Sequence, residues 1–423
     1  MGLFDTYQNG NIYGWLKKCI VFLISPVIGI FAVLPSIQTK ASQLLLGCCF
    51  VVMGFSMVIP EYETEDLNFD SIRYRQMFED VADNPNLTFA LVFVNCLING
   101  DSEDLLAPIL FYLVGKCTYN YHILFGVIAV IFSFFMIKTL RYFVDEPNYN
   151  FSILCLVLLF LFTSNQILNI NAFRFYIAMW VVMYGVFKVY IDHKKWYLIL
   201  IALSPMIHAS CLVLFPIFLL AWILRNHAQL LYCGVVICLL LSPLIFTFIE
   251  IFVQILPENL SGHFGSYLDP EYIHRINKGG TGMIWVVRVF ETSVLLLINA
   301  IVYLFARHYT DSIAPSKCKN LYILLLVITA FTNITILVPS LGSRYIMYTL
   351  PLIAYIFLVC FAGNRKYNIW AYAIGGVFIA FFLFLPWNIY QVPCLRFYTK
   401  LWDADVLYQS PIILFFKYVI EGL

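Results

Sequence analysis

Apolar residues form long blocks in this chain, and short polar segments separate the blocks. A helix rises about 1.5 Å per residue, so about 20 apolar residues cross a hydrocarbon core of roughly 30 Å. The pattern therefore predicts an all-α fold, a polytopic integral membrane protein with about 12 (11–14) transmembrane helices. The expected spans are 19–36, 43–60, 122–140, 150–167, 173–191, 196–208, 210–224, 228–250, 282–305, 320–339, 345–361 and 368–386.

The composition supports a membrane protein. Hydrophobic residues make up 62% of the 423 residues, only 12% are charged, and the mean hydropathy is +0.86. No soluble globular domain needs that much apolar surface. We expect a single polytopic membrane domain over 1–423, and we interpret the first block as a retained helix rather than a cleaved signal. The twelve cysteines are scattered without a CxxC pair, so neither a disulfide framework nor a zinc site is predicted. No acidic cluster has the spacing of metal ligands, and we expect neither a metal nor a cofactor.

Charge in the loops predicts which side each loop faces. Lys188, Lys194 and Lys195 mark one loop as cytoplasmic, because cytoplasmic loops carry an excess of Lys and Arg. Proline breaks the segment 196–224, and we interpret it as a hairpin that turns at His208. With that turn, the basic loops that follow also lie in the cytoplasm, whereas a single span would invert them.

This topology places several polar stretches on the outer side. They include an acidic, amphipathic segment over 61–121, which holds two shorter apolar pieces at 87–99 and 104–115, and a loop over 251–281. We expect short amphipathic helices there and a cavity that opens to this face. The N-terminus also lies outside, and its lysines depart from the charge rule.

Arginines are placed on the outer side, where the charge rule does not put them. Arg73, Arg174, Arg288 and Arg344 belong to this group. A guanidinium group presents a planar fork of donors that fits phosphate oxygens, so these arginines predict an anionic ligand. Structural pairing with the outer acidic residues is the competing interpretation.

Asp70, Arg73 and Tyr74 have the spacing i, i+3, i+4, which places them on one face of a helix. A carboxylate there could act as a base toward a sugar hydroxyl, while an arginine orients an anion. A solvated helix with a surface ion pair is the alternative.

Arg174 opens an apolar helix after a polar turn that contains Asn171, and helix N-termini favour anions. Snorkelling to the membrane interface is the structural alternative. His208 lies at a proline-broken turn and is directed to the same side, so it is either a catalytic group or a structural hydrogen-bond donor.

Three later features complete the candidate set. Arg288 and Glu291 are three residues apart on one helix, where an internal ion pair is the simplest explanation. Arg344 and Tyr345 begin a helix after a flexible turn, as Arg174 does. Tyr267 lies in a polar, aromatic loop on which sugars could stack, although aromatic residues also form the normal interfacial belt.

Neither GxGxxG nor a P-loop is present, so an activated substrate must arrive at the membrane. No basic, aromatic surface for nucleic acid is present either. Four motifs in order resemble the EpsG and Wzy group of bacterial polysaccharide polymerases over roughly residues 60–361. They are Asp70–x3–Tyr74, AsnAlaPheArg (171–174), AspHisLysLysTrp with ProMetIleHisAlaSer (192–210), and GlySerArgTyr (342–345).

The resemblance implies a glycosyltransferase that joins undecaprenyl-diphosphate-linked oligosaccharide repeat units at the periplasmic face of the bacterial inner membrane. Arg73, Arg174, Arg288 and Arg344 would bind the diphosphate, and Asp70 or His208 would deprotonate or position the acceptor. The substrate-positioning candidates are Tyr74, Asn171, Glu291, Tyr345 and Tyr267. Expected partners are membrane lipids, a flippase and a chain-length regulator, but no nucleic acid.

Other functions use the same chemistry. A lipid-linked single-sugar transferase or a ligase shares the donor and differs in the acceptor. A flippase for lipid-linked oligosaccharide predicts charges along a central path and often inverted repeats, neither of which is visible here. A scaffold would leave the buried arginines unexplained.

Overall fold

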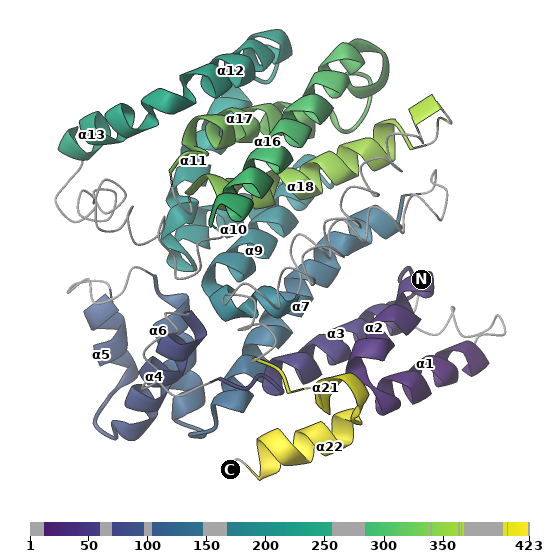
Figure 1. Cartoon of the computed structure of the whole chain (residues 1–423), viewed down its shortest axis with the longest axis vertical. Coiled ribbons are helices and arrows are strands. Elements are labelled where there is room, and N and C mark those ends of the chain that lie inside the picture. Colours follow the sequence, from purple (N-terminus) through teal and green to yellow (C-terminus); the bar gives the residue numbers. More distant parts are fainter. Residues whose placement is uncertain are drawn as a thin grey trace. The chain divides into compact units, whose positions relative to one another are not determined.

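A computed structural model gives the fold of residues 12–59, 70–96, 104–146, 167–255, 284–338, 341–367 and 401–421, except for residues 363, 365 and 404. These residues form helices and turns, with one isolated β-bridge between Met57 and Trp402, so the predicted all-α fold is confirmed (Figure 1). The chain divides into two compact units. The first comprises 1–147, 165–212 and 394–423, and the second comprises 148–164 and 213–393.

The first unit contains most of the candidate site. Its helices and helical turns are α1 (Ile12–Ile24), α2 (Pro26–Val33), η1 (Leu34–Ser36), α3 (Lys40–Phe55), α4 (Asp70–Asp83), α5 (Phe89–Val94), α6 (Leu106–Gly115), α7 (Tyr121–Val144), η3 (Ile167–Ala172), α9 (Phe173–Tyr190), η4 (Lys195–Tyr197), α10 (Leu198–Leu203), η5 (Ser204–Met206), α21 (Asp405–Tyr408), α22 (Pro411–Phe415) and η10 (Phe416–Ile420). The turn η6 (Ala209–Val213) leads into the second unit.

Helix α3 packs antiparallel against α7 through a glycine contact. A Cβ at Gly54 would lie 2.4 Å from the Cβ of Ala129, so only glycine allows the two backbones to approach this closely. Small residues at helix contacts are the usual way in which membrane helices pack. Helix α9 lies parallel to α7, since Phe132 meets Trp180 near the middle and Tyr142 stacks on Phe187 near the end.

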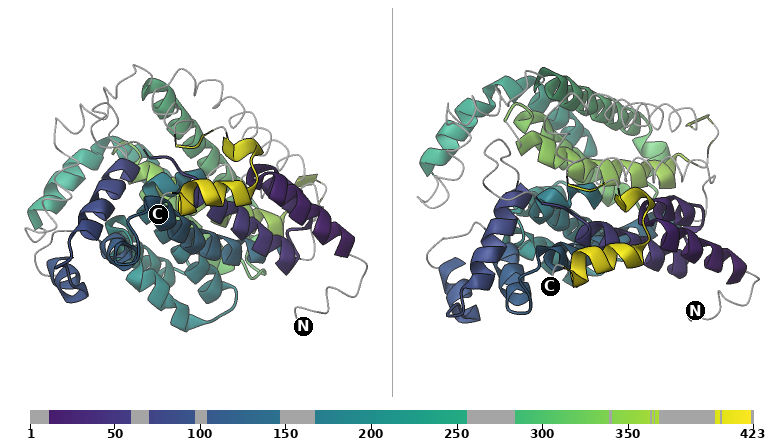
Figure 2. Two further views of the ribbon diagram at one scale, coloured as in Figure 1. Left: turned by 90° about the horizontal axis from the view of Figure 1, so that it is seen from below. Right: turned by 60° about the horizontal axis from the view of Figure 1, so that its bottom comes forward.

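The C-terminal helices return to the end of this bundle at which α3 finishes and α7 begins. Trp402 Nε1 donates to the carbonyl of Met53 over 2.8 Å, and Asn120 Nδ2 donates to the carbonyl of Tyr418 over 2.9 Å. Helix α22 lies beside α3, where Phe55 and Phe415 make an edge contact (Figure 2). The end of the chain thereby fixes the end of the α3–α7 pair.

The second unit packs around α17. Its elements are α11 (Leu214–Ile223), α12 (Ala228–Leu241), η7 (Ser242–Leu244), α13 (Ile245–Ile255), α16 (Ile284–Arg307), η9 (Tyr309–Ile313), α17 (Lys319–Thr335) and α18 (Leu341–Cys360). Buried Asn333 of α17 exchanges two 2.8 Å hydrogen bonds with Asn299 of α16 and donates to the carbonyl of Val235 of α12. One amide therefore joins three helices.

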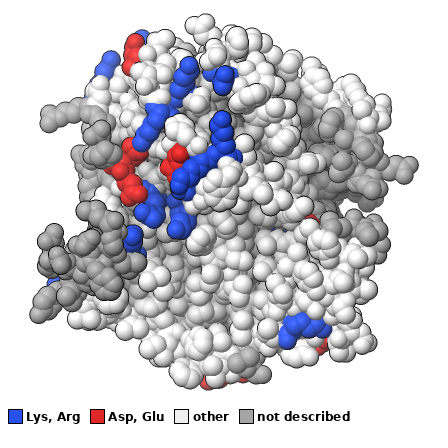
Figure 3. Space-filling model, turned by 180° about the vertical axis from the view of Figure 1, so that it is seen from behind, with Lys and Arg blue, Asp and Glu red and all other residues white. Residues whose placement is uncertain are grey.

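Among the described residues, three helices are long and apolar enough to cross a membrane: Tyr121–Val144, Ile170–Tyr190 and Ala228–Ile251. They match the predicted spans at 122–140, 173–191 and 228–250. Other predicted spans are shorter apolar helices here, and 368–386 and nearly all of 150–167 lie outside the described residues. On the face shown in Figure 3, charged side chains gather in a few places and uncharged residues cover most of the described surface, as expected for a membrane protein.

Two segments show how proline divides the apolar blocks. The prediction of one helix over 19–36 is wrong, because the chain breaks into α1 and α2 at Ser25, whose hydroxyl caps α2, and at Pro26, which has no N–H to continue α1. The break predicted near His208 is confirmed, because η5 ends at Met206 and η6 begins at Ala209. The segment 61–121, which is predicted to lie on the outer side, contains α4, α5 and α6.

Candidate active site

Arg174 lies in the first turn of α9, directly after the turn η3. Its Nε donates to the hydroxyl of Tyr74 over 2.7 Å, and its Nη1 donates to Oδ2 of Asp104 over 2.8 Å. The side chain of Asp104 is only 1% exposed, and that of Arg174 is 22% exposed. Tyr74, Asp104 and Arg174, here called the Arg174 cluster, come from three segments far apart in the sequence. They form a buried ion pair with a hydroxyl beside it.

Aromatic rings enclose Tyr74. Its ring centre lies 4.8 Å from that of Phe173 and 6.2 Å from that of Phe111, and the guanidinium carbon of Arg174 lies 5.2 Å from it. Burial raises the pKa of Tyr74 to about 12, although the positive charge of Arg174 opposes the shift. The phenol is therefore neutral at physiological pH. Its oxygen accepts from Arg174, and its proton remains available to a further acceptor.

Asn171 ties helix α4 to the start of α9. Its Oδ1 accepts a hydrogen bond of 3.2 Å from the backbone N–H of Ser71, in the first turn of α4. The adjacent Asp70 begins α4 and forms an ion pair with Arg73, whose side chain is 55% exposed. The predicted shared face thus contains a real Asp70–Arg73 pair at the surface, while Tyr74 points into the protein.

His208 lies in the turn between η5 and η6. The backbone N–H of Ser210 donates to Nδ1 of His208 over 3.2 Å, and the Ser210 hydroxyl lies 2.7 Å from the same atom. Because a backbone N–H can only donate, Nδ1 is the acceptor, and the proton of the neutral ring is on Nε2. The ring also makes an edge contact with Phe175 at 5.6 Å. In this arrangement Nε2 is the hydrogen-bond donor of the His208 ring.

One backbone contact links the His208 turn to the Arg174 cluster. The N–H of Leu105, next to Asp104, donates to the carbonyl of Met206 over 2.7 Å. Phe175 meets His208 and follows Arg174 directly in α9. The first unit therefore brings four predicted residues, Tyr74, Asn171, Arg174 and His208, to one end of its helix bundle.

The other end of the bundle is basic. Lys40 begins α3, Lys138 and Arg141 lie near the end of α7, and Lys188 lies in the last turn of α9. Asp192 accepts from Lys188 over 2.6 Å and from Tyr142 over 2.7 Å. Burial alone would raise the pKa of Asp192, but these two hydrogen bonds and the nearby lysine charges lower it. The Arg174 cluster and the basic residues thus lie at opposite ends of α7 and α9.

The remaining predicted residues belong to the second unit or lie outside the described part. Arg344 and Tyr345 are the fourth and fifth residues of α18, and buried Tyr345 meets the ring of Phe331 at 4.6 Å. Arg288 and Glu291 lie on α16, whose side chains are not described at those positions, and Tyr267 lies outside the described residues.

Asp104 is the site residue that sequence reasoning missed. It ends the acidic turn between the apolar pieces 87–99 and 104–115, where a solvated acid is the ordinary interpretation. The available signal was its place just before an apolar helix. Without the third dimension, nothing distinguished it from Asp101 or Glu103.

Comparison with known proteins identifies the relationship of the chain. The family model described as EpsG family matches residues 45–399, a range that contains the Arg174 cluster and His208. No curated protein and no solved structure matches the chain.

Proposed function

This chain belongs to the EpsG family of Wzy/EpsG-like polymerases, and we propose that it polymerises O-antigen or exopolysaccharide. It joins undecaprenyl-diphosphate-linked oligosaccharide repeat units at the periplasmic face of the bacterial inner membrane. The growing glycan is the donor, and a sugar hydroxyl at the non-reducing end of a new unit is the acceptor. The observation that carries the proposal is the buried Arg174 cluster at the end of the bundle opposite the basic residues.

The charge distribution supports the choice of membrane face. Lys138, Arg141 and Lys188 lie at the far end of α7 and α9. Basic residues concentrate on the cytoplasmic side, so that end belongs to the cytoplasm and the Arg174 end to the periplasm. About 18 helical residues separate the two ends, which corresponds to roughly 27 Å and thus to most of a hydrocarbon core.

The reaction is a single displacement at the anomeric carbon in this proposal. The acceptor hydroxyl oxygen forms a bond to the anomeric carbon of the donor glycan, and the bond from that carbon to the diphosphate oxygen breaks. The electron pair of the broken bond leaves with undecaprenyl diphosphate, and the hydroxyl proton passes to a base. Negative charge therefore develops on the leaving diphosphate, and a preorganised cation there lowers the barrier.

Arg174 is the cation that we assign to the diphosphate. Two of its N–H groups bind Tyr74 and Asp104, and within the described residues its Nη2 makes no hydrogen bond. Those two contacts hold the guanidinium plane, and its remaining donors serve phosphate oxygens. Arg73, which lies in the same unit, is assigned to the same diphosphate, and the assignment of Arg288 and Arg344 to a diphosphate stays a prediction from the sequence.

Asp70 is assigned as the base, and His208 donates from Nε2 to the substrate. Its Nδ1 already accepts from Ser210, which makes the imidazole a better donor than base in this turn. Asn171 positions Asp70 by holding the first turn of α4. Tyr74 is assigned to substrate positioning, and the same role for Glu291, Tyr345 and Tyr267 stays a prediction from the sequence.

Purified protein in vesicles, supplied with lipid-linked repeat units, tests the reaction. A polymerase makes glycans that are longer by whole repeats and releases undecaprenyl diphosphate in equal amount. A flippase moves the lipid across the bilayer and leaves every glycan at one unit, and a ligase needs a different lipid acceptor. Absence of longer glycans with active, folded protein would reject the proposal.

A further inference from the structure

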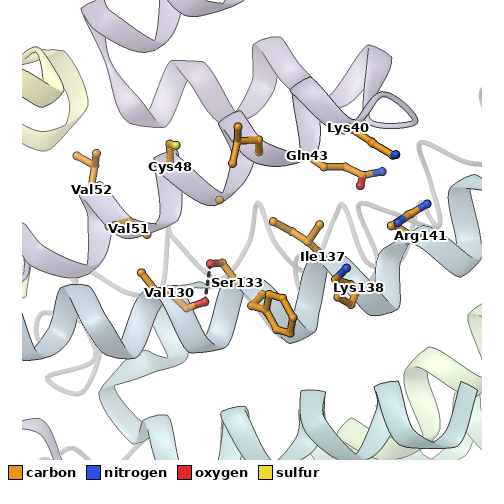
Figure 4. A pocket seen from close by; sticks show the side chains of 13 residues that line it. Lys40, Gln43, Cys48, Val51, Val52, Val130, Ser133, Ile137, Lys138 and Arg141 are labelled. Carbon is orange, nitrogen blue, oxygen red and sulfur yellow. Dashed lines mark hydrogen bonds between the residues drawn. The ribbon is translucent and has the colours of Figure 1, made fainter. Parts of the chain in front are cut away.

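A groove of about 690 Å³ runs between α3 and α7 of the first unit (Figure 4). Its walls are mostly apolar and include Leu44, Gly47, Val51, Val130, Phe134 and Ile137. Several of these large side chains are exposed among the described residues, with Leu44 at 71% and Phe134 at 51%. The volume lies within the range that holds a small-molecule ligand. The groove is therefore suited to a hydrocarbon chain.

One end of the groove is cationic. Lys40 begins α3, and Lys138 and Arg141 lie near the end of α7. Because the helices are antiparallel, the three cations meet at the same end, as the labelled side chains in Figure 4 show. Arg141 is 3.9 Å from Asp145, and both side chains are exposed, so this pair neutralises it only weakly. Three positively charged side chains thus lie at one end of an apolar groove.

We propose that this groove binds an anionic phospholipid, with its phosphate at Lys40, Lys138 and Arg141 and one acyl chain along the apolar walls. Phosphate is the anion that clustered Lys and Arg recognise at a membrane surface. Lys138 lies 17 residues after the start of α7, about 26 Å along the helix. A lipid held here is therefore different from the one whose diphosphate meets Arg174.

Native mass spectrometry of the full-length protein in detergent, titrated with phosphatidylglycerol, tests the charge requirement. Lys138→Gln with Arg141→Gln should weaken binding about 25-fold, since each cation near a phosphate contributes about fivefold. The matched control is Lys194→Gln with Lys195→Gln, two exposed cations at the same end of the bundle that do not line the groove. The control should bind like the wild type.

A second pair of variants tests the apolar walls without changing charge. A Cβ at Gly47 would lie 3.4 Å from Cδ1 of Ile137, so Gly47→Leu should fill the groove and abolish lipid binding. Gly234→Leu is the control, because a Cβ at Gly234 meets no atom within 4 Å. A melting transition checks that each variant is folded.

Three results would overturn the proposal. Wild-type binding by both the charge variant and Gly47→Leu would place the lipid elsewhere and mean that another part of the chain fills the groove. Equal binding of phosphatidylcholine, whose zwitterionic headgroup has no net charge, would remove the preference for an anionic lipid. Stronger binding of undecaprenyl phosphate, lost in the same variants, would assign the groove to a polyprenyl lipid instead.

Discussion

Arg174 and Asp104 form a buried ion pair, in which Nη1 of Arg174 donates to Oδ2 of Asp104 over 2.8 Å. The two residues are 70 positions apart in the sequence. The pair joins the start of α9 to the chain just before α6. It holds the guanidinium group in place, and other N–H groups of Arg174 remain to bind phosphate oxygens. A site for a leaving diphosphate requires such an arrangement.

The losses of stability caused by removing the two partners of this pair should not add. Asp104→Ala leaves a largely buried cation unpaired, which costs about 3 kcal/mol in the free energy of unfolding. The double variant Asp104→Ala, Arg174→Ala should lose clearly less than the sum of the two single variants. Unfolding of the detergent-purified variants measures this coupling. Simple additivity would mean that the two side chains do not interact.

Tyr74→Phe keeps the ring between Phe173 and Phe111 but removes the oxygen that accepts from Arg174. We expect a loss of about 1 kcal/mol of stability and a clear loss of polymerisation. The folded protein favours the neutral phenol, whose pKa is raised to about 12. This contribution is present below pH 10, the ordinary value for tyrosine, and is lost as the pH rises toward about 12.

Unfolding measured at several pH values checks the pH dependence. Wild-type stability should fall between pH 10 and 12 more steeply than that of Tyr74→Phe. Equal slopes in the two proteins would mean that Tyr74 titrates as an exposed tyrosine does. The control is Tyr119→Phe, because Tyr119 is exposed on the same unit and should leave the slope unchanged.

His208→Gln and His208→Ala distinguish a donor from a base. Gln places an amide N–H near the position of Nε2, so it should retain part of the activity if His208 donates from that atom. His208→Ala should retain little. Repeat-unit transfer by purified protein provides the measurement at matched protein levels. Equal, complete loss in both variants would instead favour proton transfer by the imidazole.

Two substitutions of buried residues on α17 should differ in their effect on the stability of the second unit. Asn333→Leu removes the amide that joins α17 to Asn299 and Val235, and we expect a loss of about 1–2 kcal/mol. Thr329 is also fully buried on α17, but its hydroxyl has no hydrogen-bond partner among the described residues. Thr329→Val should therefore be neutral or stabilising. Thermal unfolding of both variants in one detergent measures the difference in stability between them. An equal loss of stability in both variants would contradict this prediction.

The sequence predicts the helical fold and the longest spans well, because hydrophobicity and length alone define them. It also predicts the break near His208 from Pro205. The segment 19–36 was harder, since its apolar character indicates a span while Ser25 and Pro26 end one helix and begin another. The capping interaction of Ser25 divides the segment into two helices there, although the hydropathy predicts one span.

The candidate site is only partly visible in the sequence. Arg174 and His208 stand out as ionisable groups in apolar blocks, but the contacts of Arg174 with Tyr74 and Asp104 cross 100 and 70 residues. No periodicity encodes such contacts. The spacing of Asp70 and Arg73 correctly predicts a shared helix face, yet their pair lies at the surface whereas Tyr74 is buried. Whether a side chain of this motif is buried depends on the helices that pack against α4, and the motif carries no information about them.

Glycan length in cells that lack this gene tests the central claim most directly. The cells would carry the wild type, Arg174→Ala, Arg174→Lys or the control Arg225→Ala, whose arginine is exposed in the second unit, all at matched membrane levels. We predict a ladder of repeats with the wild type and Arg225→Ala. Arg174→Ala should give a single unit, and Arg174→Lys, which keeps the charge but loses the fork, should give few repeats. A normal ladder with folded Arg174→Ala would contradict the assignment of the Arg174 cluster to polymerisation.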